Sequence, residues 1–153
     1  MKLTVYRKAY NWRHATQEAK VQVLEKRGSV GFFKSYIGLS YVKEDGMDRV
    51  ASYWDVANVQ ELVEYWMKRR GYEERPNISC IVEGPLVLSS FTTRLEQEQV
   101  VQVSGNLAFT DVPDENMKQT LVEFFVFLKV ELQQPAVTVE FHGHSGVDRI
   151  GLF

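Results

Sequence analysis

The segment between Pro113 and Pro135 constrains the fold most, because it is apolar on almost every side of a helix. Asp114 and Glu115 follow the first proline, where acidic side chains favour the positive end of a helix dipole. The apolar positions are Met117, Leu121, Val122, Phe124, Phe125, Val126, Phe127, Leu128, Val130 and Leu132. Such a helix is enclosed in a core, or it packs one face on a sheet and another on an interface. We predict a helix over about residues 114–133, with a homodimer through it as one possible arrangement.

A second helix is predicted over about residues 58–70. Asn58 can accept hydrogen bonds from the first free backbone N–H groups, and Glu61 three residues later completes a pattern like a capping box. Three cations and then Gly71 end the segment, as expected for the negative end of a helix and its cap. One face is apolar through Val59, Leu62, Val63, Trp66 and Met67.

Short segments rich in β-branched and aromatic residues surround the two helices and predict strands. The apolar positions within residues 15–27 fit both the period of a helix and the two-residue alternation of a strand, and we favour a helix or irregular structure there. Asp45–Gly46 and Glu83–Pro85 are predicted as turns, and residues 96–99 as a polar link. The predicted strands cover about residues 3–10, 33–41, 48–54, 77–82, 86–93, 100–110, 137–141 and 147–153. With no linker or repeat in the chain, residues 1–153 are predicted to form a single α+β domain, with a mostly antiparallel twisted sheet and two main helices.

The composition excludes several classes of protein. The chain of 153 residues is 44% hydrophobic and 25% charged, which is typical of a globular domain and not of a disordered one. No apolar run reaches the roughly 20 residues of a membrane helix, and basic residues interrupt every apolar stretch near the start, so we predict neither membrane association nor a leader. A single cysteine, Cys80, fits a reducing compartment, and we expect a cytoplasmic protein.

The charge is distributed unevenly along the chain. Residues 1–27 hold seven basic and two acidic side chains, which is +5, and the other 126 residues hold eleven and eighteen, which is −7; the sum is the net charge of −2. This balance lacks the basic footprint of a nucleic-acid-binding protein, so no nucleic acid is expected as a partner. An acidic body can instead attract a basic protein partner.

One cluster has the residue types of a chemical site. His142 and His144 are two residues apart, which places both imidazoles on one face of a strand, and Asp148 could supply a third metal ligand. Arg149 could then hold a phosphate or carboxylate. The simpler interpretation is a solvated polar turn at the end of a strand, and it is the one that we favour. We therefore expect no bound metal and no other cofactor.

Nucleophilic catalysis has little support in the sequence. Cys80 lies in an apolar strand and is expected to be an inert thiol, and no Gly-x-Ser-x-Gly pattern occurs. The glycine-containing segment Gly28–Gly31 lacks the residues of a phosphate-binding loop. These absences lead us to predict that the chain is not an enzyme.

A short motif resembles a known family. Ser52–Asp55 reads Ser-Tyr-Trp-Asp, and a helix with Trp66 and an Ile/Val strand follow it. Over about residues 50–110 this arrangement is similar to the immunity proteins of contact-dependent growth inhibition systems. The resemblance implies a small bacterial protein of the cytoplasm that binds and neutralises a cognate toxin, often a nuclease, without catalysis of its own.

The leading hypothesis is thus a non-catalytic immunity protein that occludes the active site of a toxin. The predicted partner-binding residues are acidic and lie in predicted turns or links: Glu44, Asp45, Asp48, Glu96 and Glu98. The alternative is a metal-dependent hydrolase or phosphodiesterase that uses His142, His144 and Asp148.

Overall fold

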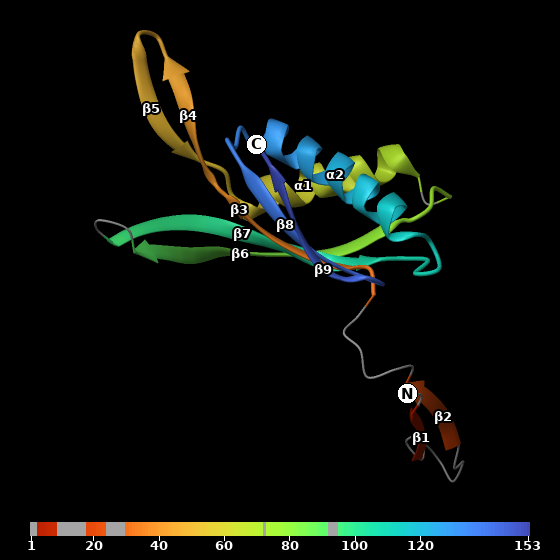
Figure 1. The fold of residues 1–153 in the computed structure, drawn as a ribbon. Coiled ribbons are helices and arrows are strands. Elements are labelled where there is room, and N and C mark those ends of the chain that lie inside the picture. Colours follow the sequence, from red (N-terminus) through yellow and green to blue (C-terminus); the bar gives the residue numbers. More distant parts are fainter. Residues whose placement is uncertain (1–2, 9–17, 24–29, 72, 92–94) are drawn as a thin grey trace, which may run out of the picture.

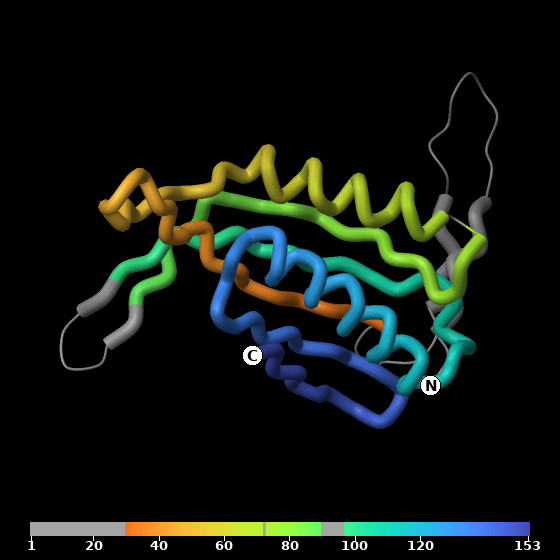
Figure 2. Tube along the Cα trace, turned by 90° about the horizontal axis from the view of Figure 1, so that it is seen from above, coloured from red at the N-terminus to blue at the C-terminus, as the bar shows by residue number. Residues whose placement is uncertain are grey.

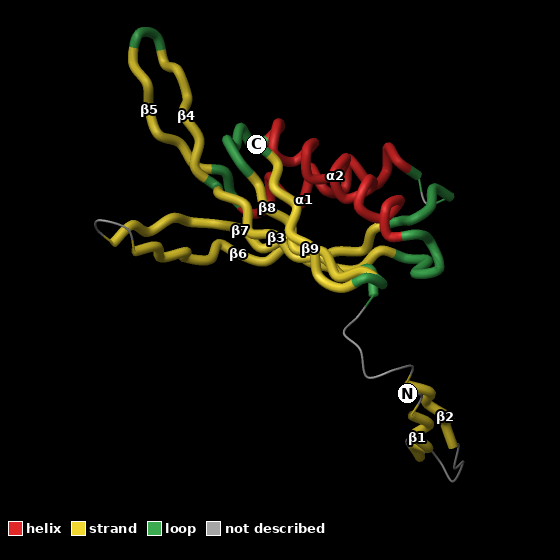
Figure 3. Tube along the Cα trace, viewed as in Figure 1, coloured by secondary structure: helices red, strands yellow, loops and turns green. Residues whose placement is uncertain are grey.

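A computed structural model describes the backbone of residues 3–8, 18–23, 30–71, 73–91 and 95–153, and side chains from residue 30 onward except 72 and 90–96. Two helices, α1 (Val56–Arg70) and α2 (Asp114–Glu131), lie on the same face of an antiparallel sheet (Figures 1 and 3). The predicted α+β class is confirmed. No helix among the described residues is long and apolar enough to cross a bilayer.

Five strands form the main sheet, in the order β6-β7-β3-β8-β9, with every neighbouring pair antiparallel. The strands are β3 (Phe32–Gly38), β6 (Ile78–Phe91), β7 (Leu95–Leu107), β8 (Val137–Gly143) and β9 (Gly146–Leu152). The middle strand, β3, pairs with two strands from distant parts of the chain. The sheet edges are β6 and β9.

The core lies between this sheet and the two helices. Successive residues of a strand point to opposite faces, so Phe33 and Ile37 of β3 face the helices and are completely buried. From the helical side, Phe124 and Phe125 of α2 meet Phe33 edge-on, with ring centroids 6.4 and 5.8 Å away. The prediction that α2 is enclosed holds for this face, whereas Val130 on the opposite face is 62% exposed.

Helix α1 begins two residues before the predicted start. Asp55, not Asn58, is the N-cap: its carboxylate accepts from the Asn58 N–H at 2.9 Å, and the Asn58 side chain accepts from the Asp55 N–H at 3.0 Å. Asn58 is therefore the third helical residue of the capping box. The predicted C-terminal end at Arg70 and Gly71 is correct.

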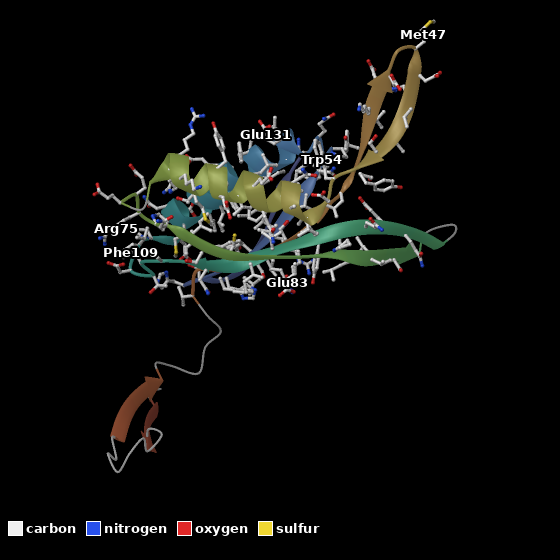
Figure 4. All side chains as sticks on the ribbon, turned by 180° about the vertical axis from the view of Figure 1, so that it is seen from behind. Met47, Trp54, Arg75, Glu83, Phe109 and Glu131 are labelled. Carbon is white, nitrogen blue, oxygen red and sulfur yellow. The ribbon has the colours of Figure 1, made fainter. Side chains whose placement is uncertain are left out.

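Strands β4 (Ser40–Asp45) and β5 (Asp48–Tyr53) form a hairpin that projects from the domain, here called the β4–β5 arm. The predicted strand 33–41 is interrupted at Leu39, where the chain leaves the sheet. Trp54 fixes the base of the arm, because its backbone N–H donates to Leu39 and its indole N–H donates to the Leu132 carbonyl at 2.9 Å. Met47 lies at the far tip (Figure 4).

Strand β6 is one long strand, where two strands and a turn were predicted. The segment Glu83–Pro85 is an irregularity within it, and β6 continues to pair with β7 beyond this point. Residues 96–99, predicted as a polar link, belong to β7. A shift in the β6–β7 register takes the place of the expected turn, because the segments before and after Glu83–Pro85 both pair with β7.

The N-terminal prediction also needs correction. Glu18–Val23 is a strand, β2, paired antiparallel with β1 (Leu3–Lys8), so a helix over residues 15–27 is wrong there. The alternation of Ala19, Val21 and Val23 was the correct signal. The remaining residues of that range lie outside the described part of the chain.

Candidate ligand site on the open face of the sheet

The predicted cluster of His142, His144 and Asp148 does not come together as one site. His142 is 2.7 Å from Glu140 through Nε2, and the ammonium of Lys118 is 2.7 Å from Asp148. The hydrogen bond that Lys118 donates to Asp148 raises the pKa of Lys118. His144, in the β8–β9 turn, contacts Asp114 instead.

These separate pairings remove the geometric basis of the metal-site alternative. Within the residues that the structure describes, no group of three or more His, Cys, Asp or Glu side chains is arranged to hold a metal ion. The register of β8 and β9 pairs Asp148 with Phe141 and His142 with Val147, so the side chains of Asp148 and His142 point to opposite faces of the sheet. Cys80 behaves as predicted in one respect, since burial raises the pKa of its thiol to about 11 and keeps it neutral.

Asp114 ties the start of α2 to the β8–β9 turn. Its carboxylate accepts from the backbone N–H groups of His144 and Ser145 at 2.9 and 3.0 Å, and from the His144 ring at 2.7 Å. Gly143 permits this approach, because a Cβ there would lie 2.6 Å from Asp114 Oδ2. Partial burial opposes ionisation, but the hydrogen bonds from His144 and Ser145 prevail and lower the pKa of Asp114 to about 2.

We expect the Asp114→Asn variant to lose about 1–2 kcal/mol of unfolding free energy at pH 6, because one acceptor of a charge-assisted network is lost. The folded-state pKa lies below the ordinary value of 3.8, so this contribution is present above pH 4 and disappears as the pH falls toward 2. Urea unfolding at pH 6 and pH 2.5 measures both the loss of unfolding free energy and its dependence on pH. The exposed neighbour Asp111→Asn is the control, and an equal loss at the two pH values would contradict the assignment.

The face of the sheet opposite the helices is polar and open. Phe32, Lys34 and Tyr36 of β3 alternate with the buried residues and point to this face. The register places Glu140 of β8 beside Lys34, and Arg149 of β9 beside Glu140, as a row across three strands. Glu83 of β6 lies on the same side (Figure 4).

A hollow of about 200 Å³ lies on this face. It is lined by Lys34, Ser35, Tyr36, Thr138, Glu140 and Arg149. The Ser35 hydroxyl donates to the Thr138 carbonyl at 2.7 Å, which satisfies the one buried polar side chain that lines the hollow and ties β3 to β8. The Lys34 ammonium lies 5.7 Å from the centroid of the Tyr36 ring.

The charged side chains of the hollow suit a ligand that carries both a negative and a positive group. The hydrogen bond from His142 lowers the pKa of Glu140, and Lys34 and Arg149 lower it further. Neither cation forms an ion pair with a carboxylate within the described part of the chain. Lys34 and Arg149 can therefore bind an anionic group of a ligand. The ionised carboxylate of Glu140 and the ring face of Tyr36 can bind a cationic group.

The predicted acidic residues lie elsewhere. Glu44, Asp45 and Asp48 are exposed near the tip of the β4–β5 arm, where Glu44 Oε1 is 4.0 Å from Arg49 Nε. Glu98 is on β7, close to the backbone of Gly38. The side chain of Glu96 lies outside the described residues. Among the predicted acidic residues whose side chains the structure describes, three therefore lie together on the arm.

Sequence reasoning missed the hollow almost entirely. Of its charged residues only Arg149 was singled out, as a partner of the histidine cluster. The available signal was the alternation of aromatic and charged residues on β3, opposite a buried face of the same strand. It could not be used without the register, because Lys34 and Glu140 are 106 positions apart and only β3–β8 pairing makes them neighbours.

The comparisons with known proteins bear on the fold. No family model and no curated protein sequence matches the chain. Two solved structures match it, both of a phage SAM lyase, one in the apo state and one in complex with S-methyl-5′-thioadenosine. Each has a TM-score of 0.52 over 85% of this chain; the apo structure is 18% identical with 94% of its chain covered, and the complex 19% with 95% covered.

These matches correct the prediction that the chain is not an enzyme. The fold is one that a lyase uses, and the missing nucleophile and metal motifs were no reason to exclude catalysis. The resemblance to immunity proteins is not tested by these matches and stays a prediction.

Proposed function

We propose that this protein binds S-adenosylmethionine (SAM) on the open face of its sheet and cleaves it to S-methyl-5′-thioadenosine. The observation that carries the proposal is the fold match, which covers nearly the whole chain of a SAM lyase seen with that nucleoside bound. A fold hosts many functions, so the proposal also rests on the chemistry of the hollow.

S-methyl-5′-thioadenosine is what remains of SAM when the bond from the sulfonium sulfur to the γ-carbon of the amino-acid chain breaks. The electron pair of that bond returns to sulfur, which loses its positive charge. The γ-carbon then forms a new bond within the amino-acid fragment. Either the carboxylate oxygen attacks it and closes a lactone, or the neighbouring carbon loses a proton and the electrons of that C–H bond form a double bond to the γ-carbon. Both routes balance without a second reactant.

The amino-acid end of SAM matches the side chains of the hollow. Its carboxylate suits Lys34 and Arg149, and its ammonium and sulfonium groups suit Glu140 and the face of Tyr36. A volume of about 200 Å³ accommodates this end of the molecule. The adenosine would then extend over the neighbouring open sheet, which carries polar and aromatic side chains.

The test is to incubate the purified full chain with SAM and to follow S-methyl-5′-thioadenosine by chromatography, with mass spectrometry to identify the second product. Formation of the nucleoside, with either a lactone or an alkene as co-product, is the expected result. Binding of SAM without turnover would contradict the catalytic step, and no binding at millimolar SAM would reject the proposal as a whole. SAM incubated without protein controls for its spontaneous decay.

The acidic group on the β4–β5 arm favours a second candidate function, which is binding of a basic protein partner such as a toxin. Glu44, Asp45 and Asp48 surround the fully exposed Met47, so charge and an apolar contact are presented together on a projecting hairpin. Co-expression with the product of the adjacent gene tests it. A complex that survives reversal of all three charges would contradict this role of the arm.

A further inference from the structure

A groove runs between α1 and the edge strand β6, on the side of the molecule away from the hollow. Its volume is about 520 Å³, and its lining residues are Gln60, Val63, Glu64 and Met67 of α1 with Ile78, Ser79, Cys80 and Val82 of β6. A second hollow of about 360 Å³ shares Met67 and Ile78 and extends the groove to Lys68, Gly71 and Asn77. Figure 2 shows α1 running alongside β6 at this edge of the sheet.

The outer edge of β6 is unpaired, because β7 is its one partner among the described strands. Edge strands are usually protected by charges, prolines or bulges. From Ile78 to Val82 the strand has none of these, and the irregularity with Pro85 comes only after this stretch. Backbone N–H and C=O groups are therefore available for strand pairing beside an apolar groove.

We infer that this groove binds an extended peptide segment of a partner protein, which adds to β6 as an antiparallel strand and carries a basic side chain followed two residues later by an acidic one. Strand addition beside a helix is an established mode of peptide recognition, in which backbone pairing supplies affinity and pockets supply specificity. The neutral thiol of Cys80 and the side chains of Val63 and Met67 supply the apolar floor.

The order of the charges follows from the geometry of α1. Glu64 and Lys68 are both exposed on the rim of the groove, and neither forms an ion pair within the described residues. Four residues of helix rise about 6 Å, which matches about two residues of strand. The short connection from Gly71 to Asn77 makes α1 run opposite to β6. A strand antiparallel to β6 therefore meets Glu64 first and Lys68 second.

The experiment uses two blocked hexapeptides of the same composition, Val-Lys-Val-Glu-Val-Thr and Val-Glu-Val-Lys-Val-Thr, titrated to millimolar concentration into the isotopically labelled full chain. Backbone amide shifts of residues 78–82 and 64–68 report binding. We expect the basic-first peptide to bind about five- to tenfold more tightly, since two exposed ion pairs replace two repulsions. The double variant Glu64→Lys/Lys68→Glu should invert this preference.

Backbone pairing is tested separately with the basic-first peptide N-methylated at alternate residues, in the two possible sets. One set should abolish the shifts and the other should not, because alternate N–H groups of a strand point to opposite sides. Equal affinity of the two peptides, a preference for the acidic-first peptide, or shifts outside the groove would each overturn the inference. Self-association of the chain that Glu64→Lys/Lys68→Glu abolishes would overturn it too, because a second copy would be the occupant.

Discussion

Replacing Phe124 with alanine is expected to lower the unfolding free energy by about 3–5 kcal/mol. The Phe124 side chain is completely buried, and its ring lies 4.8 Å from that of Trp66 on α1 and 4.9 Å from that of Phe125, measured between centroids. It also contacts Phe33 of the central strand. The substitution removes the group at which both helices meet the sheet and leaves a cavity among the surrounding rings.

Urea unfolding at neutral pH measures this effect, with Val126→Ala as the control. Val126 lies on the same helix and is 40% exposed, so its truncation should cost well under 1 kcal/mol. Similar losses for the two variants would mean that the helix layer is not packed as described.

The second large effect is expected at the open face. Substitution of Arg149 by methionine should lower kcat/KM for SAM cleavage by about 10- to 100-fold, because a hydrogen-bonded charge on the substrate carboxylate is worth roughly 1.5–3 kcal/mol. Lys34→Met should also lower kcat/KM, since both cations line the hollow. The readout is the rate of S-methyl-5′-thioadenosine formation.

Arg49→Met on the β4–β5 arm is the matched control, because it removes an exposed cation that does not line the hollow. Its kcat/KM should match that of the parent protein. Unfolding midpoints of all three variants separate a binding effect from loss of structure. Full activity in both Arg149→Met and Lys34→Met would place the substrate elsewhere.

Local patterns were sufficient to predict both helices and most strands. The apolar faces of α1 and α2 repeat with helical period, so their existence followed from the residues alone. The start of α1 was placed two residues late because Asn58 and Asp55 are both good caps, and only the observed pair of hydrogen bonds distinguishes them.

Predictions failed where the answer depended on pairing between distant segments. The stretch Glu83–Pro85 looks like a turn, yet β7 supplies partners on both sides of it and keeps β6 continuous. His142, His144 and Asp148 are close in sequence, yet Glu140, Asp114 and Lys118 take them as separate partners. Two of these three partners belong to α2, which no local pattern could have placed beside the β8–β9 turn.

The sequence by itself therefore determined the class of fold and the two helices, because both depend on local periodicity. The tertiary structure decided which charged side chains share a surface. Lys34, Glu140 and Arg149 become neighbours through the register of three strands, and Glu64 faces an unpaired edge only because β6 ends the sheet. Strand order is a property of the whole chain, since each pairing competes with all the others for the same backbone hydrogen bonds.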